Sequence, residues 1–301
     1  MEEPPGDGPG TTAVRRRWET LGLPGLIDVH VHFMPERVMA KVWSYFDRAG
    51  PLIGRPWPIR YRLGEAERLQ LLREWGVRAF PSLVYPHRPG MAVWLNGWAG
   101  EFATRVPECL RTATFFPEES AGAYVGAAIA GGARVFKAHV QVGGYDPRDP
   151  LLDPVWGQLA DARVPVLAHV GSGPVAGEFT GPGPIAEVLR RHPRLVLIVA
   201  HLGYPEPLAF ADLALAHDAV YLDTTMAFVD FWGPQAGTAG LLSRLVALEQ
   251  RIVFGSDFPN IPHDYVHQLE VLERLDLDER WYRAVYYENA ARLFGLPPAA
   301  G

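Results

Sequence analysis

The sequence predicts an α/β fold, a closed (β/α)8 barrel of the TIM type, and three observations support this prediction. The chain has 301 residues and 48% hydrophobic content, which suits one barrel of about 250 residues with insertions. Short apolar runs rich in β-branched residues alternate regularly with runs of helical periodicity. The short runs are apolar on both faces, which is typical of parallel strands covered by crossover helices.

Eight strand-like runs can be placed in order along the chain. They cover residues 26–33, 77–85, 110–116, 134–140, 164–170, 195–201, 220–223 and 252–256. Helical patterns separate nearly all of them, over residues 65–75, 91–105, 118–130, 151–162, 184–191, 205–216 and 238–249, and at least two further helices close the chain. Eight such units favour a closed barrel, and no Gly-x-Gly-x-x-Gly motif follows the first strand to support a dinucleotide-binding sheet.

The same pattern predicts the domain organisation. Residues 1–12 carry little that could pack, so we expect a disordered tail, followed by a short helix over 13–21 and a single barrel domain over 13–301. The connection at about 34–63 is long for a compact domain and holds several aromatic residues among prolines. It is either a lid, whose Trp57 and Tyr61 help to roof a pocket, or a helix and an extended arm packed on the barrel rim.

Composition and charge exclude several classes of function. The formal net charge is −6 and the one basic run is Arg15-Arg16-Arg17, so nucleic acid is a poor candidate partner and a barrel nuclease is disfavoured. The single Cys109 cannot form an internal disulfide, which fits a reducing cytoplasm. No apolar run approaches the ~20 residues of a membrane span. We therefore expect a soluble cytoplasmic protein that binds a small molecule, neither nucleic acid nor membrane, with a homodimer as one open assembly state.

Histidine and aspartate side chains stand at the carboxyl ends of four predicted strands. His30 and His32 are two residues apart on the first strand, so both project from one face. His169, His201 and Asp257 end the fifth, sixth and eighth strands. Each has an ordinary structural explanation by itself, but a barrel brings these strand ends together where barrel enzymes hold their active sites. Imidazole and carboxylate together form a ligand set for a divalent transition metal such as zinc.

This pattern resembles the amidohydrolase superfamily, and within it the branch that includes aminocarboxymuconate semialdehyde decarboxylase. The resemblance covers most of the chain from Leu26 onward and rests on Ile27-Asp28-Val29-His30-Val31-His32, residues 165–171, His201-Leu202-Gly203, residues 255–259 and residues 288–294. It implies one divalent metal, most simply Zn²⁺ and otherwise Mn²⁺ or another transition metal, bound by His30, His32, His169 and Asp257. His201 would stand beside it, hydrogen-bonded to the metal-bound water or to the substrate.

Two positions on the fourth strand, Lys137 and His139, share a face and could both line the barrel mouth. Some members of the superfamily have a carboxylated lysine on this strand that bridges two metals. The alternative is an ammonium group that binds an anionic substrate or pairs with a carboxylate, and the fuller match to the one-metal branch favours it. Asp28 has the same parity as His30 and lies deeper, so we expect it to support the ligands or to pack.

The sequence thus leads to the hypothesis of a metal-dependent hydrolase that acts on an amide, ester or lactone. The metal would lower the pKa of its bound water toward ~7. Asp257, as catalytic residue, would pass the water's proton to the leaving group, and His201 would polarise or position the reacting carbonyl.

The alternative enzyme is a non-oxidative decarboxylase of an unsaturated or aromatic carboxylate, which would use the same metal site. Such a substrate needs a cationic clamp, for which the candidates are Arg60, Arg62, Arg88 and Lys137. The candidate substrate-binding residues are Lys137, His139, Trp57 and Arg60. A non-catalytic metal-binding barrel is a third class, but every position of the resemblance is filled here.

Overall fold

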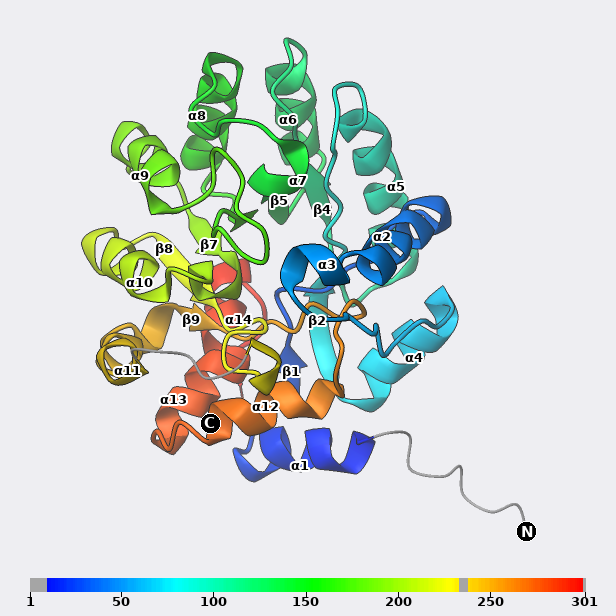
Figure 1. The fold of residues 1–301 in the computed structure, drawn as a ribbon, viewed down its shortest axis with the longest axis vertical. Coiled ribbons are helices and arrows are strands. Elements are labelled where there is room, and N and C mark those ends of the chain that lie inside the picture. The colour runs from blue at the N-terminus through cyan, green and yellow to red at the C-terminus, as the bar shows by residue number, and fades with distance from the viewer. Residues whose placement is uncertain (1–9, 233–237, 300–301) are drawn as a thin grey trace.

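The computed structural model describes residues 10–232 and 238–299, and its strands form the predicted barrel (Figure 1). The strands in the described residues are β1 (Leu26–Ile27), β2 (Val77–Pro81), β3 (Cys109–Leu110), β4 (Thr112–Thr114), β5 (Val135–His139), β6 (Val166–His169), β7 (Leu197–Val199), β8 (Val220–Asp223) and β9 (Ile252–Val253). Only Arg111 separates β3 from β4, so these two segments act as one barrel strand. Every pair of neighbours is parallel, and the strand order follows the chain.

The barrel closes between the segments that follow β1 and β9. The His32 amide donates to the Phe258 carbonyl at 2.7 Å, and the Asp257 amide donates to the His30 carbonyl at 2.8 Å. A parallel bridge joins Val31 to Phe258 at the same seam. Closure confirms the predicted (β/α)8 barrel, and it places His30 and His32, which follow β1, directly beside Asp257.

Helices surround the strands in Figure 1. They are α1 (Thr11–Thr20), α2 (Glu36–Arg48), α3 (Gly50–Ile53), α4 (Glu65–Glu74), α5 (Ala92–Arg105), α6 (Ala121–Ala130), α7 (Val140–Gly143), α8 (Asp153–Ala162), α9 (Pro182–Arg191), α10 (Pro207–Ala216), α11 (Thr238–Ala247), α12 (Tyr265–Glu273), α13 (Glu279–Arg283) and α14 (Asn289–Phe294). Short helical turns are η1 (Pro150–Leu152), η2 (Ala200–Gly203), η3 (Asp230–Trp232), η4 (Glu249–Arg251) and the π-type η5 (Ala284–Glu288). Of the described helices, none is long and apolar enough to cross a membrane.

The first helix begins at Thr11, earlier than the expected residue 13. Gly10 precedes it in the left-handed conformation, and Val14 and Trp18, one turn apart, are both buried. The Trp18 indole donates to the Trp75 carbonyl at 2.9 Å, which fixes α1 against the barrel. The predicted disordered tail over 1–12 falls mostly on residues 1–9, which lie outside the described residues.

The long connection after β1 has two structurally different parts. Its first part is helical, α2 followed by α3, and its second part is an extended arm that packs on the barrel rim. In the arm, the Trp57 indole donates to the Asn260 carbonyl at 2.6 Å, and the Tyr265 amide donates to the Tyr61 hydroxyl at 2.8 Å. Tyr61 is buried beside Trp75, so the arm belongs to the core around the barrel.

Candidate metal centre

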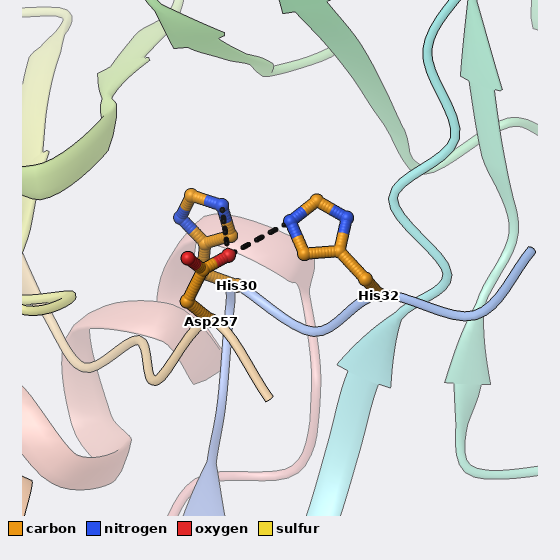
Figure 2. A group of neighbouring side chains, drawn as sticks. All are labelled: His30, His32 and Asp257. Carbon is orange, nitrogen blue, oxygen red and sulfur yellow. Dashed lines mark ion pairs between the residues drawn. The ribbon is translucent and has the colours of Figure 1, made fainter. Parts of the chain in front are cut away.

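The two histidines of the His-x-His pair follow β1 and point toward Asp257 (Figure 2). Nδ1 of His30 bonds to the Asp223 carboxylate at 2.8 Å, and Nδ1 of His32 bonds to the Leu83 carbonyl at 2.8 Å. These oxygens accept, so the hydrogen-bond network assigns the ring hydrogen to Nδ1 in both residues. Each Nε2 therefore keeps its lone pair, and both lone pairs are available to a metal.

Asp257 faces both of these nitrogens. Its Oδ1 lies 2.9 Å from Nε2 of His32 and 3.6 Å from Nε2 of His30, and the candidate ligand atoms of the three residues lie within 4.8 Å of one another. Three buried electron-pair donors at this separation fit a cation between them, which is the donor set of a divalent transition metal.

The fourth predicted ligand, His169, ends β6, which pairs with β5 and β7. Its Nε2 bonds to the Gly173 carbonyl at 2.8 Å, so the lone pair is on Nδ1. The ring stacks on His139 at 4.2 Å between centroids and lies 4.8 Å from the ring of His201. Burial lowers the pKa of His169 to about 3, which keeps the imidazole neutral. The structure thus groups three of the predicted ligands closely, and places His169 beside His201.

His201 lies in η2, immediately after β7, with its ring 4.9 Å from that of His30. Its Nδ1 bonds to the Thr225 carbonyl at 3.2 Å, which again leaves the Nε2 lone pair open. The backbone here is left-handed, with φ of 57° at His201, 50° at Leu202 and 72° at Gly203. The imidazole lies beside the ring of His30 and lines the same cavity.

Sequence reasoning missed Asp223, the last residue of β8. It is completely buried. One carboxylate oxygen accepts from Nδ1 of His30, and the other accepts from the amides of His201 and Thr225 at 2.7 and 3.1 Å. The signal was present in the sequence, because Asp223 ends a strand at the same edge as the other site residues. One side chain therefore orients two histidines from different strands.

Asp28 supports the site from below, as predicted. Its carboxylate accepts from the amides of His30 and Ser256, both at 3.1 Å, and from the Tyr265 hydroxyl at 2.9 Å. Burial raises the pKa of Asp28 to about 7, against the effect of these hydrogen bonds. Asp28 thereby ties the first strand to the segment that carries Asp257.

A cavity of about 1090 Å³ opens above these side chains. Of the predicted site residues, it reaches His30, His32, Trp57, Lys137, His139, His169, His201 and Asp257, but neither Arg60 nor Arg62. Arg60 points to the surface instead, because its Nε donates to Asp264 at 2.7 Å, and Arg62 likewise pairs with Asp47. Tyr61 lies in the core and does not roof the cavity, whereas Arg88 lines it.

Comparison with known proteins identifies the family. The amidohydrolase family model matches residues 27–296, nearly the whole described chain. The chain belongs to the amidohydrolase family. It is therefore an enzyme, and the superfamily resemblance inferred from the strand-end motifs is confirmed. Amidohydrolases of this superfamily use a divalent metal, which agrees with the group of His30, His32 and Asp257.

Several solved structures share the barrel fold. An uncharacterized TIM-barrel protein from Bordetella bronchiseptica matches with a TM-score of 0.71 at 18% identity, over 90% of this chain and 98% of its own. The 5-carboxyvanillate decarboxylase from Novosphingobium aromaticivorans, complexed with manganese and 4-hydroxy-3-methoxy-5-nitrobenzoic acid, matches with a TM-score of 0.64 at 14% identity, over 90% and 96%. A proposed 2-pyrone-4,6-dicarboxylic acid hydrolase from Pseudomonas putida matches with a TM-score of 0.58 at 16% identity, over 90% and 98%. No curated protein matches the sequence.

In this amidohydrolase, Lys137 lies on β5 and is completely buried. Its Nζ is 3.4 Å from Nε2 of His30, so it reaches the predicted metal ligands. Burial lowers the pKa of Lys137 to about 8, against the opposing charges of Asp223 and Asp257. Lys137 is thus a completely buried cation that lines the cavity. It occupies the strand position at which we expected either a carboxylated lysine that bridges two metals or a free ammonium group.

Proposed function

We propose that this amidohydrolase is a mononuclear metal-dependent hydrolase that acts on an amide, ester or lactone of a small molecule. One divalent ion, most simply Zn²⁺ and otherwise Mn²⁺ or another transition metal, would be held by His30, His32, His169 and Asp257. The observation that carries the proposal is the set of three buried electron-pair donors within 4.8 Å, with both histidines fixed in the ligating tautomer.

We assign the steps of the reaction to the metal ion, Asp257 and His201. When bound, the ion supplies Lewis acidity and lowers the pKa of water. The carboxylate of Asp257 lies beside the Nε2 atoms of both histidines, so it is placed to accept a proton from water and later release it to the leaving group. The open Nε2 of His201 faces the same cavity and can hold or orient the reacting carbonyl group. The helical part of the connection at 34–63 covers the mouth, and we propose that it acts as a lid.

A second candidate is a non-oxidative decarboxylase that uses the same residues. It is favoured by the cations that line the cavity, among them Lys137 at its base and Arg88. A fold relative is a decarboxylase whose structure holds manganese and a nitrobenzoic acid. Release of carbon dioxide would identify this reaction, whereas hydrolysis would give a stoichiometric new acid together with an amine or alcohol.

Elemental analysis of the purified protein tests the metal centre, and one divalent ion per chain is expected. His30→Ala and His32→Ala should lose the ion, whereas Asp212→Asn, a change in an exposed ion pair with Arg244, should keep it. Two ions per chain would overturn the mononuclear assignment and restore Lys137 as a bridge. No ion after zinc or manganese supplementation would sink the proposal.

A further inference from the structure

One face of α2 forms part of the cavity wall. The residues of α2 that line the cavity recur at helical spacing, and they are Arg37, Val38, Lys41, Val42, Tyr45 and Phe46. Arg37 and Lys41 are one turn apart, which places their Cβ atoms about 5–6 Å from each other on the same face. Two cationic side chains of α2 therefore line the cavity.

A third cation, Arg88, comes from the segment between β2 and α5 and lines the same cavity. The two segments are packed together, because Val38 and Val42 of α2 share a hydrophobic cluster with Met91. Arg88 is three residues from Met91 in the chain. The contact thus brings Arg88 to the side of the cavity that carries Arg37 and Lys41.

These three cations have no counter-charge in the cavity other than Asp257, which is the sole carboxylate that lines it among the described residues. Within 10–232 and 238–299, neither an ion pair nor a side-chain hydrogen bond engages Arg37, Lys41 or Arg88. Arg60 and Arg62, on the same connection, are both paired with aspartates. An acidic chain of net charge −6 thus concentrates unpaired positive charge at its cavity.

The three cations lie at the outer end of the cavity. Their residues are exposed, whereas the proposed metal ligands are 1–9% exposed at its base. Aromatic side chains also line the cavity, among them Phe46, Trp57, Tyr85 and Trp94. The volume of about 1090 Å³ is at the upper limit of ordinary ligand pockets, which hold about 300–1000 Å³.

We propose that Arg37, Lys41 and Arg88 form an outer anion subsite that binds a carboxylate at the end of the substrate remote from the metal centre. The substrate would be an elongated molecule with a flat, unsaturated or aromatic body, a reacting group at the base and a carboxylate at the mouth. The guanidinium groups match the two oxygens of a carboxylate, and the lysine adds a point charge. This assignment rests on the proposed function in one respect, the identification of the end of the substrate that reacts.

Direct binding tests the subsite without turnover. The probes are terephthalate and the longer 4,4′-biphenyldicarboxylate, each compared with its monomethyl ester, titrated into the metal-loaded protein by calorimetry. The variants are Arg88→Gln and the double variant Arg37→Gln, Lys41→Gln. The matched control is Arg62→Gln, which removes a cation of the same connection that does not line the cavity.

The wild type and the control should bind at least one diacid about tenfold more tightly than its monoester, and this preference should weaken with salt because it is electrostatic. The double variant should lose the preference, and Arg88→Gln should reduce it, with metal content unchanged in both. Equal affinity of the wild type for diacids and monoesters, or a preference that persists in the double variant, would overturn the subsite. A failure of the proposed function would show instead as missing metal or missing hydrolysis while this preference remained.

Discussion

Replacing Asp223 with asparagine should weaken metal binding without unfolding the protein. In the wild type, the carboxylate oxygen Oδ1 accepts from two backbone amides, and Oδ2 accepts from Nδ1 of His30. Asparagine has one acceptor oxygen, which must stay with the two amides of His201 and Thr225. Its NH₂ group would then face Nδ1 of His30, and donor would meet donor.

In the Asp223→Asn variant, His30 can relieve this conflict if its ring hydrogen moves from Nδ1 to Nε2. That nitrogen lies 3.6 Å from Asp257 and is the one expected to hold the metal, so its lone pair would be lost. Changes to a residue that orients a metal ligand cost about 10–100-fold in metal affinity, or about 1.4–2.7 kcal/mol. We therefore expect a Kd for Zn²⁺ raised by this factor in Asp223→Asn.

Competition with a chromophoric chelator measures this Kd, and thermal unfolding of the metal-free protein measures stability on the same preparations. Asp223→Ala is the contrasting variant, because it leaves the two buried amides unpaired and should also lower stability by about 1–3 kcal/mol per unpaired group. Asp212→Asn controls for the loss of one surface carboxylate. Two results would refute the tautomer argument. One is a wild-type affinity for Zn²⁺ in Asp223→Asn, and the other is a fraction of metal-binding protein that falls no further than the fraction of folded protein.

Three further predictions concern other residues of the described chain. His201→Ala should keep close to full metal while turnover falls by ~10²–10⁴-fold, the worth of one positioned acid–base group; metal loss as severe as in His169→Ala would make His201 a ligand. Gly203→Ala should lower the free energy of unfolding in urea by about 1–3 kcal/mol, since φ is 72° and an added Cβ would lie 2.0 Å from the Phe210 ring; an unchanged midpoint would contradict this. Burial raises the pKa of Cys109 to about 12, so its thiol stays protonated at pH 8 and should react with a thiol reagent only after denaturation; rapid labelling of the native protein would disprove the burial.

The barrel and the grouping of its strand-end residues could be predicted because both depend on periodicity along the chain. His30, His32 and Asp257 each end an apolar run, and parallel strands force such ends to one edge of a barrel. Asp223 obeys the same rule and could have been found by applying it to the short strand 220–223. Its importance lies in the hydrogen bond to His30, a contact across 193 residues that no local pattern contains.

Substrate-facing residues were harder to predict because loops decide them. Arg60 pairs with Asp264, which is 204 residues away in sequence. The residues next to Arg60 in the chain therefore could not indicate that its side chain lies outside the cavity. Arg37 and Lys41 were missed for the opposite reason. They lie on a face of α2 that lines a cavity together with apolar and aromatic residues, whereas charged helical residues ordinarily face solvent.

The seam between the first and last strands has a consequence for biosynthesis. His30 and His32 are translated early, whereas Asp257 follows more than two hundred residues later, and the seam that joins them forms only when the last strand docks. A nascent chain that ends before Asp257 therefore holds two of the three clustered donors. Binding of an ion by all three donors thus requires the last strand to dock, so a bound ion would oppose reopening of the barrel.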